Sequence, residues 1–504
     1  MKIKAVALNM HDHNTYDGVL HRQEERHSRK KHNIDNEDIH SPRLSQKFFK
    51  EQFVPIYDSL GYSEESILAF TCSNLGKIYT EALLFPYLPS KDFLNLVPKN
   101  LWDYKLKNGL YYIDHHQSHA AYAFLSSGYQ ESDILAIDGQ GTNFSCIFVD
   151  KSGNITDLSS VLSVGGLWNL LAQYLGMGYL GAGKSMGLAG YGKYCCQAEQ
   201  VIHSYLKEPN HKLPSNSTIL ESSSKENIAF TLQKITTDLV CSELRRLQTS
   251  SNLCLSGGVA YNGYLNEETT KIYNTVHVPP AVGDEGQSLG SYAHANKVLN
   301  NCVEIPNVYS GASYVVDTKM LKNLRWQRKP IAEIRKEVAF SISKGAIVGW
   351  YQGKSESGNR ALGNRSILAD PRHPDIKNII NSKIKKREDF RPFAPSVLVE
   401  HYKDWFNTRI PSPYMSRIVP VLSKQIPGVT HVDGTARLQT ISIEFNTSYY
   451  CLIEEFRQLT GVPMLLNTSF NCHEPIVETP EDALKCFNTT GLDYLVIDDY
   501  LIKK

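Results

Sequence analysis

Three histidines stand within five residues in the segment DHHQSHAAYA, and two of them have the spacing of a chelating pair. His115 and His119 are four residues apart, so in a helix that begins at His115 their imidazoles project from one face. Two imidazoles at that spacing can bind one metal ion. The carboxylates of Asp138 and Asp284 follow apolar runs and can complete the ligand set. Such a set favours Fe(II), Mn(II) or Zn(II) over Mg(II). The alternative is that these are ordinary polar histidines at the surface or in the core.

Glycine-rich segments form a second group with the chemistry to bind phosphate. GYLGAGKSMGLAGYGK contains six glycines and two lysines, among them Lys184, and LSGGVAYNGYLN contains Gly257, Gly258 and Asn262. A phosphate can approach the backbone closely where no Cβ intervenes, and N–H groups at the start of a helix attract an anion. Neither segment matches the P-loop or the dinucleotide pattern. We therefore predict nucleotide binding at glycine turns of another kind.

The C-terminal half carries a third group of polar residues: Arg360, Lys385, Arg437, Asn467 and Ser469. Guanidinium, ammonium, amide and hydroxyl groups together suit a small, doubly charged phosphate ester or anhydride. Each charge-assisted hydrogen bond contributes about 1.5–3 kcal/mol, so a few of them suffice for such an anion. Any one arginine is open to the alternative of a surface charge. In KIKKREDFRPFAPSVL, however, the basic residues interleave with Phe and Pro, which favours a buried site.

The elements that must position these groups indicate an α/β protein. IKAVALNMHDHN and DILAIDGQGTNFSCIFVD share a pattern of apolar strand, acid or small polar residue, and turn. Such a repeated hairpin is what a two-lobed ATP-binding fold of the actin and hexokinase type needs. SHAAYAFLSS is a predicted helix that Ser118 can cap. Residues 226–248 are a second predicted helix, and residues 252–271 indicate strand, glycine turn and helix. A Pro, Gly and Ser-rich stretch at 305–315 predicts a domain boundary.

The composition excludes several classes of function. The 504 residues carry 53 Lys and Arg against 52 Asp and Glu, a net charge of +1. That balance argues against a nucleic-acid partner, because counterion release rewards concentrated positive charge. No segment approaches about 18 uninterrupted apolar residues, so no membrane span is expected. The ten cysteines include no C-x-x-C pair, which speaks against a disulfide framework or a zinc ribbon and favours a cytoplasmic protein with reduced thiols.

Taken in order, the motifs resemble those of the O-carbamoyltransferases of the nodulation-factor and antibiotic type, such as the tobramycin and cephem carbamoyltransferases. The resemblance runs through nearly the whole chain, and its motifs are MHD, EERHSRKKH, HHQSHAAYAF, DGQGTN, GKSMGLAGYG, SGGVAYNGYLN, GDEGQSLG, GWYQGKSESGNRALGNRSILADPR, INSKIKKREDFRPFAPSVL, THVDGTARLQT and LNTSFNCHEPIVETPEDAL. It implies an actin-like ATPase-type domain over residues 1–308, for metal, nucleotide and acceptor. It implies a YrdC-like α/β domain over residues 309–504, for carbamoyl phosphate and adenylate formation.

The resemblance also implies a reaction. Enzymes of this type use carbamoyl phosphate and ATP, with Mg(II), to make carbamoyladenylate, releasing phosphate and pyrophosphate. They then move the carbamoyl group to a hydroxyl and release AMP. The mixed anhydride hydrolyses readily in water, so making and consuming it inside one closed protein protects it. A small-molecule or sugar hydroxyl is the expected acceptor, and the sequence specifies no oligomeric state.

Residue roles follow from the same motifs. The expected ligands of a divalent transition metal, Fe(II) first and Mn(II) or Zn(II) as alternatives, are His115, His119, Asp138 and Asp284. The residues in nucleotide motifs are Lys184, Gly257, Gly258 and Asn262. Those expected to hold carbamoyl phosphate and the forming adenylate are Arg360, Lys385, Arg437, Asn467 and Ser469. The candidate general base for the acceptor hydroxyl is Asp12, which follows His11 in the His-Asp motif.

Two turns depart from the family pattern. The usual H-D-A-S is HDHN at residues 11–14, and the usual E-F-G-P-R-A-L-G begins ESGNR at residues 356–360. Losing Phe and Pro is expected to soften the buried turn that positions Arg360. Because the ligand residues are intact, we expect an active enzyme with an altered pocket. The alternatives are a catalytically silent nucleotide-binding relative, or carbamoyl transfer to tRNA or to a hydrogenase-maturation partner. The near-neutral charge weighs against tRNA, and the missing C-x-x-C motifs weigh against the second partner.

Overall fold

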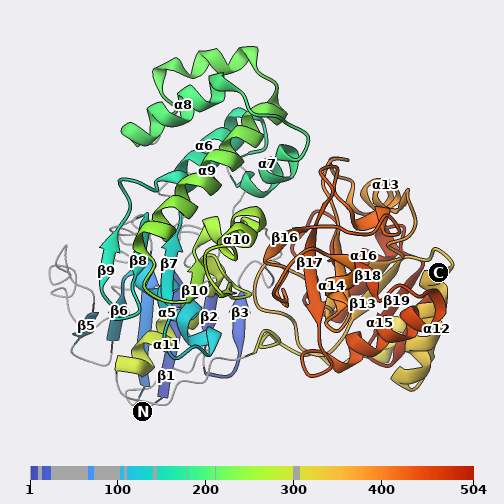
Figure 1. Cartoon of the computed structure of the whole chain (residues 1–504). Coiled ribbons are helices and arrows are strands. Elements are labelled where there is room, and N and C mark those ends of the chain that lie inside the picture. Colours follow the sequence, from blue (N-terminus) through green and yellow to red (C-terminus); the bar gives the residue numbers. More distant parts are fainter. Residues whose placement is uncertain are drawn as a thin grey trace, which may run out of the picture.

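The computed structural model describes residues 2–8, 14–16, 18–23, 26, 66–72, 103–106, 110–139, 145–178, 180–209, 212–298 and 307–504. Within these ranges the chain is a mixed α/β protein. The N-terminal and C-terminal halves form two parts that lie side by side (Figure 1). No helix among the described residues is long and apolar enough to cross a membrane.

The first sheet of the N-terminal part has the strand order β3-β2-β1-β4-β6-β5. Its strands are β1 (Lys2–Leu8), β2 (Asn14–Tyr16), β3 (His21–Gln23), β4 (Ser66–Cys72), β5 (Asp103–Leu106) and β6 (Leu110–Ile113). β2 runs antiparallel to its neighbours β1 and β3, whereas β4 is parallel to β1 and β6 is parallel to β4.

The second sheet repeats this arrangement in the order β9-β8-β7-β10-β11. Its strands are β7 (Asp133–Ile137), β8 (Cys146–Val149), β9 (Ile155–Asp157), β10 (Asn252–Ser256) and β11 (Thr275–His277). β7, β8 and β9 are again antiparallel, and β10 and β11 again continue the sheet in parallel. The antiparallel pairs β1–β2 and β7–β8 confirm the repeated hairpin that the sequence predicts.

β7 is buried on both faces, which explains its continuous apolar run. Alternate side chains of a strand point to opposite faces. Leu135 and Ile137 pack with the cluster built on α6 and α9, while Ile134 and Ala136 pack with α5. Helices therefore cover both faces of the second sheet, and its strand ends carry the polar turns.

The helices of the N-terminal part vary widely in length. They are α5 (His115–Ser127), α6 (Val164–Tyr174), α7 (Ala182–Ala189), α8 (Cys196–Lys207), α9 (Lys225–Leu247), α10 (Gly263–Thr269) and α11 (Gln287–Val298), with the short helices η4 (Ser215–Ser222), η5 (Gly258–Tyr261) and η6 (Asp284–Gly286). The predicted helix at 226–248 is confirmed as α9, whose N-cap Ser224 accepts from the Asn227 N–H. The predicted strand, turn and helix at 252–271 are confirmed as β10, η5 and α10.

The C-terminal part is built on one mixed sheet of the order β12-β20-β19-β13-β14-β18-β15-β17-β16. Its strands are β12 (Arg325–Arg328), β13 (Val348–Tyr351), β14 (Arg365–Ala369), β15 (Ala394–Leu398), β16 (Arg417–Pro420), β17 (Thr435–Ile441), β18 (Met464–Ser469), β19 (Tyr494–Ile497) and β20 (Tyr500–Lys503). Its helices are α12 (Ile331–Ser343), α13 (Ile376–Ile380), α14 (Tyr402–Trp405), α15 (Thr447–Thr460) and α16 (Pro480–Thr489), with η7 (Thr318–Leu321), η8 (Asn381–Lys385) and η9 (Pro427–Val429).

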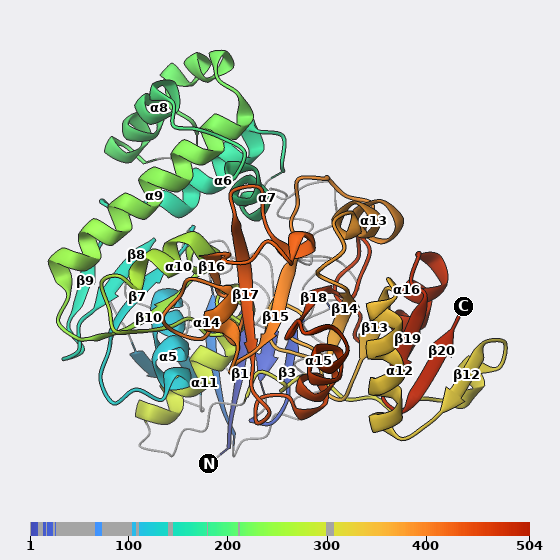
Figure 2. The ribbon, with the colours of Figure 1, turned by 45° about the vertical axis from the view of Figure 1, so that its right-hand side comes forward.

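The two parts meet where α10 lies against β16 (Figure 2). A Cβ on Gly263 of α10 would come within 2.7 Å of Ile418 Cγ1, so the glycine permits this close approach. The buried guanidinium of Arg417 bonds Glu267 across the same contact, at 3.1 Å. Residues of both halves therefore face one another along a shared seam.

Candidate functional site

Four residues that the sequence predicts as metal ligands come together at the carboxyl end of β7. The Nε2 atoms of His115 and His119 lie 3.3 and 3.0 Å from Asp138 Oδ2, and 3.4 and 3.5 Å from Asp284 Oδ1. One ligand atom from each residue lies within 4.8 Å of every other. Ligands about 2.1 Å from a zinc-like ion would lie about 3.0–3.4 Å apart. The four donors therefore have a spacing that fits one transition-metal ion.

The histidines and aspartates of this cluster shift one another's pKa values. Burial by itself would lower the pKa of His119, but hydrogen bonds and charge from Asp138 and Asp284 outweigh it and raise that pKa to about 9. Burial would likewise raise the pKa of Asp138, yet hydrogen bonds from His115 and His119 hold it well below its usual value. Both carboxylates thus lie beside nitrogen donors, and a cation would replace the proton that His119 holds.

α5 begins four residues earlier than a cap at Ser118 requires. The sequence analysis assigned the cap to Ser118, but the helix starts at His115 and Asp114 caps it. The Asp114 carboxylate accepts from the His116 N–H at 2.9 Å. Ser118 lies inside the helix, where its hydroxyl donates to the Gln287 carbonyl at 2.8 Å. The earlier start places both ligand histidines on one helical face, as their spacing requires.

The glycines after β10 lie against the metal cluster. Gly257 has φ +87°, and a Cβ there would lie 2.3 Å from the Ile137 carbonyl oxygen. A Cβ on Gly258 would lie 2.8 Å from Asp138 Oδ1. Both positions therefore need glycine, one for its backbone conformation and one for closeness to a ligand.

Two arginines of the C-terminal part reach the seam at η5. The Arg360 guanidinium lies 5.6 Å from the ring centre of Tyr261, and an Arg437 nitrogen lies 3.5 Å from the Tyr261 carbonyl oxygen. Burial lowers the pKa of both guanidinium groups, and the charge of Arg360 lowers that of Arg437 further. Two neighbouring cations that are partly buried form a site whose charge an anion would offset.

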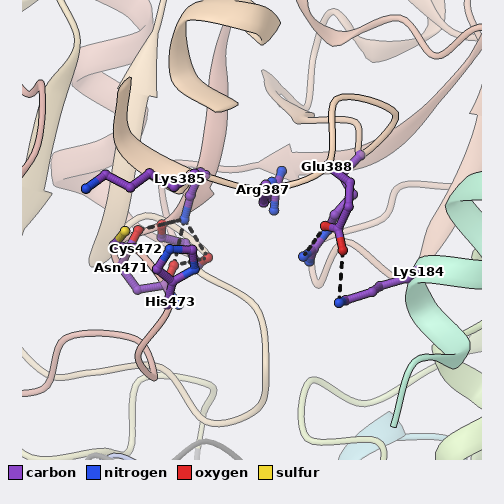
Figure 3. Close-up of a pocket in the computed structure, with 10 residues that line it drawn as sticks. Lys184, Lys385, Arg387, Glu388, Asn471, Cys472 and His473 are labelled. Carbon is purple, nitrogen blue, oxygen red and sulfur yellow. Dashed lines mark hydrogen bonds and ion pairs between the residues drawn. The ribbon is translucent and has the colours of Figure 1, made fainter. Parts of the chain in front are cut away.

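A cavity of about 500 Å³ opens between the two parts (Figure 3). Its lining is Lys184, Lys385, Lys386, Arg387, Glu388, Arg391, Ser469, Asn471, Cys472 and His473. The basic side chains outnumber Glu388, the acid of this lining. The cavity is therefore suited to an anion that carries more than one charge.

Lys385 is enclosed by the turn that follows β18. Its Nζ donates to both the carbonyl and the hydroxyl of Ser469, and to the carbonyl and side-chain oxygen of Asn471, the last at 2.6 Å (Figure 3). Since an ammonium has three protons, it must exchange one of these partners to bond a substrate oxygen. The side chain is 1% exposed. Lys385 thus both organises the turn and places a positive charge at the cavity wall.

Lys184 enters the same cavity from the opposite part. Its Nζ donates to Glu388 Oε1 at 3.0 Å, and both side chains are about one third exposed (36% and 37%). The glycine-rich segment around it was expected to be a phosphate-binding turn, but residues 182–189 form helix α7. This segment therefore contributes the side chain of Lys184 to the cavity, and it does not form a loop of open backbone N–H groups.

Two predicted site residues have structural partners instead of facing the cavity. The Asn262 side chain caps α10 through the Leu265 N–H and pairs with the Gln233 amide. The Asn467 amide donates to Ala361, Ser396 and Gln439 in the core. His11 and Asp12 lie outside the described residues.

The altered turn before Arg360 is firmly bonded. The hydroxyl of Ser357 lies 2.9 Å from His21 Nδ1 and 2.7 Å from the Ser310 hydroxyl. The Gly358 N–H donates to Gln23, and the Gly358 carbonyl accepts from Arg26 at 2.7 Å. The sequence predicts a softened turn, whereas these bonds tie it to the N-terminal part. A serine can make them because its hydroxyl both donates and accepts.

Several site residues were missed by the sequence analysis. Lys386, Glu388, Cys472 and His473 line the cavity, and Glu285 accepts from the Tyr261 hydroxyl at the seam. The first four directly adjoin residues or motifs already singled out, so contiguity along the chain was the signal. Glu285 follows a predicted metal ligand, but its contact with Tyr261 depends on how two turns pack.

Comparison with known proteins identifies the family of this chain. A family model described as the carbamoyltransferase N-terminus matches residues 23–213 and 196–293, and one described as the carbamoyltransferase C-terminus matches residues 339–504. The nodulation protein NolNO of Sinorhizobium fredii is 37% identical over 78% of this chain and 64% of its own length. The 3'-hydroxymethylcephem-O-carbamoyltransferase of Amycolatopsis lactamdurans is 33% identical over 51% of this chain and 49% of its own length. The chain thus spans less than two thirds of both relatives.

Solved structures align only loosely. The activator of the 2-hydroxyisocaproyl-CoA dehydratase from Clostridium difficile with bound ADPNP covers 61% of this chain and 100% of its own length, with 13% identity and a TM-score of 0.32. A likeness this low carries no argument about the site. The two family models, in contrast, together match most of the sequence, including all four residues of the metal cluster and the cavity lining. The chain belongs to the carbamoyltransferase family.

Proposed function

We propose that this protein is an ATP-dependent O-carbamoyltransferase with an actin-like ATPase-type domain over residues 1–308 and a YrdC-like domain over residues 309–504. Water cleaves carbamoyl phosphate to carbamate and phosphate, and a carbamate oxygen then attacks the α-phosphorus of ATP. Pyrophosphate leaves and carbamoyladenylate remains. A hydroxyl oxygen of a small-molecule or sugar acceptor then attacks the carbamoyl carbon, and AMP and a proton leave.

The basic cavity between the two parts is the observation that carries this proposal. Carbamoyl phosphate is a small dianion, and the cavity presents the Lys184 ammonium from the N-terminal part and ammonium and guanidinium groups from the C-terminal part. Ser469 and Asn471 add hydroxyl and amide groups beside Lys385. Each charge-assisted bond contributes about 1.5–3 kcal/mol, so a few of these groups suffice to hold the substrate. ATP would bind together with Mg(II), and the basic groups of the cavity would offset part of the negative charge of ATP.

The adenylate would lie at the seam beside η5. Arg360 and Arg437 are partly buried there, and among the described contacts no carboxylate is bonded to either guanidinium. A phosphate between them would offset the desolvation that lowers both pKa values and the charge of Arg360 that further lowers the pKa of Arg437. On the N-terminal side, Gly258 brings the backbone close to Asp138, so a phosphate held there would lie beside the candidate metal ligands.

The metal cluster would hold the other face of that phosphate. His115, His119, Asp138 and Asp284 would be its ligands, and their two nitrogen and two oxygen donors suit Fe(II), Mn(II) or Zn(II). A bound ion would act as a Lewis acid that withdraws charge from the phosphate. Asp12 would accept the proton of the acceptor hydroxyl. Holding the anhydride between two parts would keep water from it.

Pyrophosphate release tests the proposal directly. Purified protein is given ATP, a divalent metal and carbamoyl phosphate, with no acceptor, and pyrophosphate and phosphate are measured. Release that depends on carbamoyl phosphate supports adenylate formation. If folded, metal-loaded protein releases none, even with a panel of hydroxyl acceptors present, it is a silent nucleotide-binding relative and the proposal is wrong.

A further inference from the structure

Asn14, at the start of β2, holds the turn that carries the ligand Asp284. Its side-chain Nδ2 donates to the Asp284 backbone carbonyl at 2.7 Å. Its Oδ1 accepts from the Ser288 backbone N–H at 2.9 Å. The side chain is 1% exposed, so neither bond competes with solvent. One planar amide therefore holds two backbone groups, the carbonyl of Asp284 at the start of η6 and the N–H of Ser288 just after it.

The bond to Ser288 pairs a backbone N–H that has no hydrogen-bond partner within its own helix, α11. Ser288 lies in the first turn of α11, where backbone N–H groups have no carbonyl within the helix to bond. The amide oxygen of Asn14 takes the place of an N-cap, although it comes from another element of the fold. The start of α11 and the turn before it are thus joined to the first sheet.

The same turn is joined to the helix of the two histidines. The Gln287 side-chain Nε2 donates to the His115 carbonyl at 3.1 Å, and the Ser118 hydroxyl donates to the Gln287 carbonyl. α5 and β2 therefore both form hydrogen bonds with the turn that carries Asp284. Asn14 bonds the backbone carbonyl of Asp284, whereas His115 and His119 of α5 lie against its carboxylate.

We propose that Asn14 is a positioning residue for the metal site, acting through the backbone of Asp284. The inference rests on the proposed metal site. An amide supplies a donor and an acceptor on one rigid group, and here the two bonded groups lie four residues apart. Alanine supplies neither, and serine, the residue that the family pattern places here, is too short to reach both. The chain therefore uses its departure from that pattern to set the direction of one ligand.

A metal titration with a spectroscopic readout tests this role. Full-length protein is freed of metal with a chelator and titrated with Co(II), following the visible d–d absorption that reports ligand geometry. The variants are Asn14→Ala and Asn14→Ser. The matched control is Asn446→Ala, which removes another amide that caps a helix, here α15 of the C-terminal part, through the Tyr449 N–H. Thermal unfolding is measured for each protein.

We expect Asn14→Ala to raise the Co(II) dissociation constant about tenfold or more, in the range typical of groups that orient metal ligands. Its d–d spectrum should change, and Asn14→Ser should fall between it and wild type. Asn446→Ala should lower the unfolding temperature and leave affinity and spectrum as in wild type. Wild-type affinity and spectrum in Asn14→Ser, or in a folded Asn14→Ala, overturn the inference. Failure of the wild-type protein to bind Co(II) instead overturns the metal site itself.

Discussion

Lys184 and Lys385 line one cavity, yet replacing each by methionine should have different consequences. Methionine keeps the length of lysine and removes its charge. Lys385 is 1% exposed and enclosed by the turn at Ser469 and Asn471. Lys184 is 36% exposed and pairs with Glu388 at the cavity mouth. The same chemical change therefore removes a buried, multiply bonded cation in one case and a half-exposed ion pair in the other.

The expected loss of stability follows from these contacts. A hydrogen bond to a charged group contributes about 1.5–3 kcal/mol, and Lys385→Met removes at least two, leaving buried acceptors without donors. We expect unfolding of the C-terminal part to become easier by roughly 4 kcal/mol, which corresponds to a fall of about 8–16 °C in Tm for a part of this size. An exposed ion pair contributes about 0–1 kcal/mol, so Lys184→Met should shift Tm by no more than a few degrees.

Calorimetry and pyrophosphate release measure the two effects separately. Below the Tm of Lys385→Met, that variant should make no pyrophosphate, because both the charge and the turn are lost. Lys184→Met should stay folded and need a higher carbamoyl-phosphate or ATP concentration for half-maximal release. Equal shifts in Tm for the two variants would refute the argument from burial. Normal turnover in Lys385→Met would remove this turn from the site.

Four further predictions concern other parts of the site. His119→Ala should fold but lose bound metal and carbamoyl transfer, because one ligand nitrogen is gone; unchanged metal content by elemental analysis would contradict the ligand assignment. Arg437→Ala should lower pyrophosphate release roughly tenfold or more, the effect of one charge-assisted contact; a normal rate would place the adenylate elsewhere. Gly258→Ala should weaken metal binding, because its Cβ would come within 2.8 Å of Asp138 Oδ1, whereas Gly183→Ala, which meets no atom within 4 Å, should not; equal metal affinities would show that Asp138 can shift freely. His21→Ala and Ser357→Ala should each lower stability by about 1 kcal/mol, and the double variant by less than the sum, because both remove one hydrogen bond; full additivity in urea unfolding would show that the two side chains do not interact.

Local patterns in the sequence were enough to predict much of the architecture. The continuous apolar run of β7, the length of α9, and the strand, turn and helix at residues 252–271 all follow from patterns over short stretches. The spacing of His115 and His119 fixed their common face once a helix was assumed. Family resemblance named the acids that complete the cluster, and the four ligand atoms do converge.

The structure decided everything that depends on which distant residues meet. Asp114, not Ser118, caps α5, and the segment around Lys184 is a helix. Lys385 is bonded to a turn 84 residues away, and Lys184 meets Glu388 across 204 residues. Periodicity reports only which face of a local element is apolar. Distances of about 3 Å between remote side chains are set by how whole elements pack, and one sequence carries no local record of that packing.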